Sequence, residues 1–140
     1  MRLIDTIVVH CADTPPRMDI GANEIRRWHV VDNGWSDIGY HYVIRRNGDI
    51  EDGRPVDIVG AHARGHNQHS IGICLIGGKA EDDRYGIAEA NFTHRQYFAL
   101  DTLINDLLVQ HPIHSVVGHR DLDPGKECPC FNVKEFVGEI

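Results

Sequence analysis

Histidine and cysteine are concentrated in one short segment near the end of the chain. Residues 118–130 read GHRDLDPGKECPC and contain His119, Cys128 and Cys130. Zinc prefers imidazole nitrogen and thiolate sulfur, and a catalytic zinc site uses three protein ligands with a fourth position open to water. His119 and Cys128 are close enough in sequence to hold one ion from a single loop. His10, at the end of an apolar run, could supply a third ligand from a neighbouring strand.

The spacing leaves two kinds of metal site open. Adjacent residues of a strand point to opposite faces, so His10 and Cys11 cannot both be ligands if the strand runs through them. Spacing alone does not choose between Cys128 and Cys130. If both bound the ion, together with His119 and either His10 or Cys11, the site would have four ligands and be a closed, structural one.

The composition is that of one globular domain. The 140 residues are 41% hydrophobic and 25% charged, which is enough to bury a single core. The formal charge of -7 disfavours a nucleic-acid-binding face, which needs clustered Lys and Arg, and it also disfavours adsorption to anionic lipid. We therefore expect no nucleic-acid partner and no membrane association.

The first residues, MRLIDTIVVHC, are typical of a strand rather than of a signal peptide. No run approaches the roughly 18 apolar residues that a membrane span requires. We expect a protein that is made and kept in the cytoplasm. Disulfide bonds are not expected there among the four cysteines.

The elements that must position these side chains alternate between strands and helices. Apolar, β-branched runs predict strands at 3–11, 70–78 and 114–119, and an Asn-Gly turn predicts a hairpin over 39–53. Helices are predicted at 22–34, 94–110 and 132–140. The order β-α-β-β-β-α-β-α indicates an α/β fold with a single central mixed sheet flanked by helices. His10 and His119 each follow an apolar strand, so a rigid scaffold would hold them near the surface.

Two helices carry further signals. In the first helix, Ile25, Trp28 and Val31 are expected to face the core. Thr93, with Gln96 three residues later, forms a capping box at the start of the second helix.

Polar residues elsewhere offer further candidates. The irregular stretch 54–69 is long for a compact domain, and such loops are often functional. Tyr40 and His41 are adjacent on the predicted hairpin strand, so at most one of them can face the site.

Five stretches together carry a resemblance to a known family. They are IVVHCADT, EIRRWHVVDNGWSDIGYHYVIRRNGDIEDGR, VGAHARGHNQHSIGICLIGG, ANFT and GHRDLDPGKECPCF. In this order, the chain resembles the zinc-dependent N-acetylmuramoyl-L-alanine amidases of type 2, which are related to the peptidoglycan recognition proteins, and among them the phage branch. The resemblance runs from Ile4 to Phe131. It implies a type-2 amidase, or peptidoglycan-recognition-like, fold with one Zn²⁺ per chain.

The resemblance also assigns the site residues. It places the zinc ligands at His10, His119 and Cys128 and the catalytic residues at Tyr40 and Lys126. It therefore favours Cys128 over Cys130, and an open catalytic site over a closed structural one. Cys130 departs from the phage branch, which carries a small hydroxyl residue there. The glutamate that serves as general base in much of the wider family has no counterpart, and Tyr40 and Lys126 stand in its place, as in the phage branch.

The chemistry implied is hydrolysis of the amide between the lactyl group of N-acetylmuramic acid and the L-alanine of the stem peptide. Zinc lowers the pKa of its bound water toward neutrality. Lys126 is expected to stabilise the tetrahedral oxyanion, and Tyr40 to hydrogen-bond with the water or the tetrahedral centre. Segments 60–69 and 35–40 would border the cleft, with His62 and Asn67 as candidate contacts for the stem peptide.

The resemblance implies a phage or prophage endolysin, with one catalytic domain over residues 1–140 and no separate cell-wall-binding domain. We expect a monomer that is made in the host cytoplasm and acts on the wall after release or with a helper for export. One alternative is a non-catalytic peptidoglycan-binding module with a structural zinc, although such modules typically lack the cysteine ligand. A further role, known in a phage relative, is inhibition of a phage-type RNA polymerase, which would then be a second partner.

Overall fold

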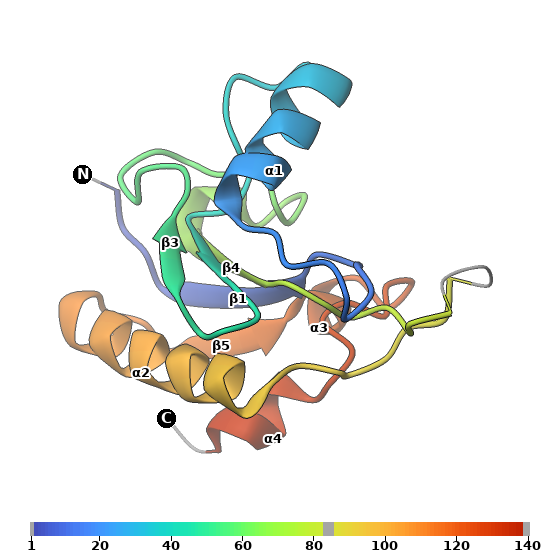
Figure 1. Ribbon diagram of the computed structural model, residues 1–140. Coiled ribbons are helices and arrows are strands. Elements are labelled where there is room, and N and C mark those ends of the chain that lie inside the picture. The colour runs from blue at the N-terminus through green and yellow to red at the C-terminus, as the bar shows by residue number, and fades with distance from the viewer. Residues whose placement is uncertain (1, 83–85, 139–140) are drawn as a thin grey trace.

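Five strands form one mixed sheet in the computed structural model, which describes residues 2–82 and 86–138 (Figure 1). In chain order they are β1 (Thr6–Cys11), β2 (Tyr42–Ile44), β3 (Ile50–Asp52), β4 (Ser70–Leu75) and β5 (Ser115–Gly118). Their order across the sheet is β3-β2-β4-β1-β5. The predicted mixed sheet and the predicted hairpin are confirmed.

Strand β1 lies between two parallel neighbours and is buried along its whole length. It pairs with β4 on one side and with β5 on the other, while β2 runs parallel to β4 and antiparallel to β3. Parallel strands end at the same edge of a sheet. The carboxyl ends of β1, β4 and β5 therefore meet, as open α/β sheets require for a site at that edge.

The helices cover both faces of this sheet (Figure 1). They are α1 (Ala22–Arg27), which continues into a π-helical turn (Trp28–Asp32), α2 (His94–Gln110), α3 (His119–Leu122) and α4 (Val133–Val137), with a 3-10 turn at Asn67–His69. Helices α2 and α4 pack on one face against Ile7, Val9 and Cys11 of β1. Helix α1 packs with β2 and β4 on the other face. No helix within the described ranges is long and apolar enough to cross a membrane.

Helix α2 starts as the sequence predicts. Thr93 Oγ1 accepts from the Gln96 backbone N–H at 3.1 Å, and Gln96 Oε1 accepts from the Thr93 N–H at 3.0 Å. The fully buried Gln96 amide also donates to the carbonyls of Ile44 and Ile76. Gln96 therefore both completes the cap at the start of α2 and ties this helix to the sheet.

Two details differ from the expectations. Val31 does not face the core and is 71% exposed, because the wider π-helical turn that follows α1 rotates later residues away from the buried face. Helix α3, which begins at His119, was not predicted, since a four-residue helix has no hydrophobic period of its own. The last two residues of the predicted C-terminal helix lie outside the described residues.

Candidate metal centre

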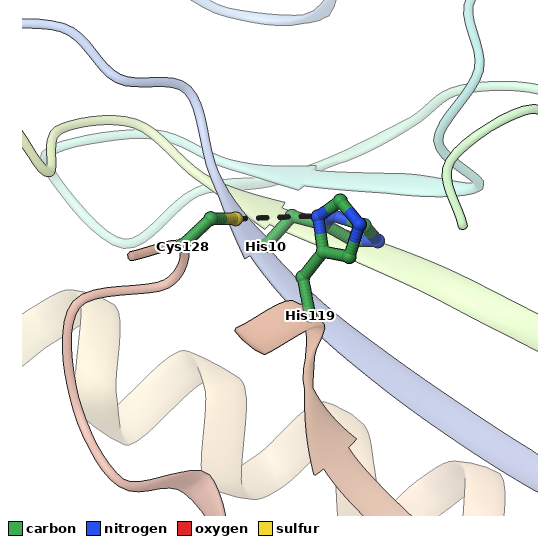
Figure 2. Close-up of side chains that lie close together, drawn as sticks. All are labelled: His10, His119 and Cys128. Atoms are coloured by element: carbon green, nitrogen blue, oxygen red, sulfur yellow. Dashed lines mark hydrogen bonds between the residues drawn. The ribbon is translucent and has the colours of Figure 1, made fainter. Parts of the chain in front are cut away.

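His10, His119 and Cys128 converge at the carboxyl edge of the sheet (Figure 2). One ligand atom from each residue can be chosen so that all three lie within 4.8 Å of one another. Among residues 2–82 and 86–138, this is the one group of three or more His, Cys, Asp or Glu side chains placed to hold a metal ion. The structure thus brings together the three residues predicted as ligands.

Strand pairing sets the two histidines side by side. On β1, Val9 and Cys11 pack toward α2, so His10 points to the opposite face. Val9 is paired with Gly118, the last residue of β5, so the residues that follow them are neighbours: His10 of β1 and His119, the first residue of α3. Their ring centroids lie 4.6 Å apart.

A close backbone approach brings the third ligand to the same place. The Arg120 N–H donates to the Cys128 carbonyl at 2.7 Å, which folds the 123–130 loop back over the end of β5. A Cβ on Gly118 would lie only 2.8 Å from Pro129 Cδ, so only glycine allows this approach. The loop thereby places Cys128 Sγ 3.9 Å from His10 Nδ1.

The electrostatics suit neutral imidazoles and a charged sulfur. Burial lowers the pKa of His10 well below its usual value, and neighbouring His62 and His119 lower it further. Burial also lowers the pKa of His119, with a smaller effect from Lys126. The backbone N–H of Cys11 donates to Cys128 Sγ at 3.1 Å, which stabilises negative charge on that sulfur. Neutral imidazole and thiolate are the forms that bind metal.

The donor set fits zinc, and it fits an open site better than a closed one. Two imidazoles and one thiolate leave the fourth tetrahedral position free. A closed site would need Cys130 or Cys11 in the same group, and the group contains neither. Cys130 Sγ instead lies 3.9 Å from Cys11 Sγ and donates to the Gly78 carbonyl at 3.3 Å.

Tyr40 and Lys126, the two predicted catalytic residues, lie near different histidines of the cluster. The half-buried Tyr40 ring is 5.1 Å from the His10 ring. Burial raises the pKa of Tyr40 well above its usual value, and the nearby thiols of Cys74 and Cys128 add to this effect, so the hydroxyl keeps its proton near neutral pH. Lys126 is exposed and borders the pocket beside His119.

That pocket has a volume of about 310 Å³ and reaches the cluster at His119. The 62–66 loop forms one wall, and the other is formed by α3 and the loop after it, including Lys126. A second hollow of about 340 Å³ lies on the other side of the 61–67 loop, beside Trp35. Both segments that were expected to border the cleft therefore lie next to a pocket.

The two predicted substrate contacts occupy this loop but are engaged within the protein. His62, only 9% exposed, has its Nδ1 2.9 Å from His10 Nε2 and its Nε2 3.2 Å from Ser70 Oγ. Asn67 Oδ1 accepts from the backbone N–H groups of His62 and Ala63 at 2.9 and 3.0 Å. Contact of either residue with a stem peptide stays a prediction. No spacing in the sequence signals the bonds from His62 to His10 and to Ser70, because they join segments that only the sheet brings together.

His41, next to Tyr40, is turned away from the cluster. Its Nδ1 accepts from the Gly72 N–H at 3.0 Å, and its Nε2 donates to the Ile58 carbonyl at 2.9 Å. Burial lowers the pKa of His41 to about 4. As expected from their adjacency, only Tyr40 of this pair lies against the candidate ligands.

Comparison with known proteins adds an independent line of evidence. The family model described as N-acetylmuramoyl-L-alanine amidase matches residues 1–131. The endolysin of Enterobacteria phage K11 is 44% identical over 134 residues, which cover 94% of this chain and 85% of the relative. The endolysin of Escherichia phage T7 is 43% identical over 132 residues, which cover 94% and 84%. Among solved structures, the N-acetylmuramoyl-L-alanine amidase LysC from Clostridium intestinale matches with a TM-score of 0.80 at 31% identity, covering 96% of this chain and 83% of that one.

Proposed function

Because the chain belongs to the N-acetylmuramoyl-L-alanine amidase family, we propose that His10, His119 and Cys128 hold one Zn²⁺ at its active site. The enzyme is a phage-type N-acetylmuramoyl-L-alanine amidase. It hydrolyses the peptidoglycan amide between N-acetylmuramic acid and the L-alanine of the stem peptide. The observation that carries the proposed site is the convergence of two imidazoles and one thiolate within 4.8 Å beside an open pocket.

The chain's own residues prepare this site for attack on an amide. Zinc bound here supplies a Lewis acid and lowers the pKa of a coordinated water. His10 and His119 remain neutral because burial lowers the pKa of each, so both keep a lone pair for the ligand role. The Cys11 N–H donates to the sulfur of Cys128 and helps to hold it in place.

Tyr40 and Lys126 act on the charge and the protons of the reacting amide. Hydrolysis passes through a tetrahedral centre whose former carbonyl oxygen becomes negative, and a nearby ammonium stabilises that charge. The Lys126 Nζ, at the pocket wall, takes this role. The protonated Tyr40 hydroxyl donates a hydrogen bond to the attacking water or the tetrahedral centre and can pass on a proton.

The substrate lies in the pocket between the 62–66 loop and α3. We place the scissile amide beside His119; His62 lines the same pocket, whereas Asn67 lines the second hollow beside Trp35. The net charge of -7 gives no long-range attraction to an anionic wall polymer, so recognition depends on contacts at this short range.

Digestion of purified peptidoglycan tests the proposal. The zinc-loaded protein, with and without a chelator, is incubated with the polymer, and the products are identified by mass spectrometry. We expect free stem peptides with a new L-alanine amino terminus, and none after zinc is removed. Glycan-linked peptides that stay intact at full zinc occupancy would contradict the proposed site.

Several expectations of the sequence analysis concern properties beyond the fold and the site. Synthesis in the host cytoplasm, action on the wall after release or with a helper for export, a monomeric state, a single catalytic domain over residues 1–140 and binding of a phage-type RNA polymerase all stay predictions. A pull-down with such a polymerase tests the last of these separately, since its failure would leave the amidase activity untouched.

A further inference from the structure

We propose that His62 is a positioning residue, which holds His10 in the orientation and tautomer that direct His10 Nδ1 at the metal. Ser70 and the carbonyl of His66 complete this hydrogen-bonded relay. The inference rests on the proposed zinc site. It assigns to His62 a contact with the nitrogen of His10 that does not face the metal.

The two nitrogens of His10 face different partners. Nδ1 lies 3.9 Å from Cys128 Sγ and so faces the other ligands, whereas Nε2 lies 2.9 Å from His62 Nδ1. His10 is 1% exposed, so water does not compete for its Nε2. We therefore infer that His10 binds the ion through Nδ1 and uses Nε2 for the hydrogen bond to His62.

The relay runs from His10 to the His66 carbonyl, and the chemistry of these two groups fixes which atom donates in each hydrogen bond. A neutral histidine that binds metal through Nδ1 carries its proton on Nε2, so His10 donates to His62 Nδ1. His62 then carries its own proton on Nε2 and donates to Ser70 Oγ at 3.2 Å. Ser70 Oγ donates in turn to the His66 carbonyl at 2.7 Å, and a carbonyl can only accept.

The charge state of His62 agrees with this direction. A protonated imidazole has a proton on both nitrogens and could not accept from His10. Because His10 Nε2 carries a proton and lies 2.9 Å from His62 Nδ1, that Nδ1 must be unprotonated, and the His62 ring is therefore neutral. The neutral ring has one donor and one acceptor, which are the two functions that the relay uses.

The surrounding backbone leaves the His62 ring one position. A Cβ on Gly72 of β4 would lie 2.6 Å from His62 Cγ, and a Cβ on Gly60 would lie 2.9 Å from His62 Cδ2. Asn67 Oδ1 fixes the backbone N–H groups of His62 and Ala63. The ring is therefore confined, and both of its nitrogens are engaged within the protein.

Zinc affinity tests the role without relying on turnover. Competition with a chromophoric chelator gives the zinc dissociation constant of the wild type, His62→Ala, His62→Asn and Ser70→Ala. We expect about 10–100-fold weaker binding for His62→Ala, as is typical when the partner of a ligating histidine is removed. His62→Asn keeps an acceptor oxygen near the position of Nδ1 and should recover most of the affinity. Ser70→Ala removes only the second link and should have a smaller effect in the same direction.

His66→Ala is the matched control, because it removes an imidazole from the same loop and keeps the backbone carbonyl that Ser70 uses. Its zinc dissociation constant should equal that of the wild type. A His62→Ala protein that binds zinc as tightly as the wild type would overturn the proposal, and so would a His62→Asn protein no better than His62→Ala.

Nitrogen-15 NMR of the zinc-loaded wild type tests the tautomers directly and needs no variant to fold. We expect protons on Nε2 of both His10 and His62, and none on either Nδ1. A proton on His62 Nδ1 would overturn the relay. The Cys128→Ser variant separates the two proposals. If this variant keeps full zinc affinity, the proposed metal site is wrong. If it loses zinc while His62→Ala binds zinc normally, only the relay is wrong.

Discussion

At the scale of single residues, the two cysteines of the last loop have different surroundings. Cys128 lies with the two histidines, whereas Cys130 contacts Cys11 and the Gly78 carbonyl. We predict that Cys128→Ser loses both bound zinc and amidase activity, and that Cys130→Ser keeps its zinc. Elemental analysis of the purified variants, together with a peptidoglycan turbidity assay, checks both. An active Cys128→Ser enzyme with a full complement of zinc would contradict the ligand assignment.

We expect Lys126 to act in catalysis and not in zinc binding. Its side chain is exposed at the pocket wall and is not among the ligand group. We predict that Lys126→Ala keeps its zinc and loses about 10²–10³-fold in kcat, the usual loss when a donor to an oxyanion is removed. Steady-state kinetics on a soluble muropeptide measures this loss. Lys134→Ala, at an exposed lysine of α4, is the control and should turn over normally. Equal kcat in the two variants would remove Lys126 from the mechanism.

At the scale of elements, the metal centre depends on how closely the last loop approaches the end of β5. A methyl group at position 118 would collide with Pro129, next to Cys128. We predict that Gly118→Ala shifts this loop and weakens zinc binding. Gly125→Ala is the matched control, because a Cβ there meets only Asp123 Oδ1 at 3.4 Å. The zinc dissociation constants of the two variants should therefore differ, and equal values would mean that the loop tolerates the displacement.

Several elements of the fold could be predicted from the sequence. Strands β1, β4 and β5, the hairpin turn and the capping box of α2 each have a local pattern, and all are present. The ligands followed from the family resemblance, since spacing alone left Cys128 and Cys130 equivalent. The bonds from His62 to His10 and to Ser70 join three separate segments. They could not be predicted because they depend on strand register and loop path, which no local pattern encodes.

At the scale of the whole molecule, buried neutral histidines link stability to pH. Burial lowers the pKa of His41 to about 4, from an ordinary value of 6.5. The unfolded chain then binds more protons than the folded one between these values, so the stability that His41 contributes is complete above pH 6.5 and is lost as the pH falls toward 4. The pKa shift of His41 alone lowers the free energy of unfolding by about 3 kcal/mol over this pH range. The low pKa of His62 acts in the same direction.

Urea unfolding of the metal-free protein between pH 7 and pH 4.5 measures this dependence. We predict a falling free energy of unfolding for the wild type and a shallower fall for His41→Gln, which has lower stability at pH 7 but no imidazole to titrate. Parallel pH profiles for the two proteins would show that His41 does not carry the linkage.

The amidase activity depends, in our proposal, on one zinc ion held by His10, His119 and Cys128. X-ray absorption at the zinc edge of the loaded protein measures this ligand set. We predict one sulfur at about 2.3 Å from the zinc and two imidazole nitrogens at about 2.0–2.1 Å, with one further light atom completing the shell. A shell with two sulfurs would show that Cys130 or Cys11 also binds and that the site is closed, and a shell with no sulfur would remove Cys128 from it.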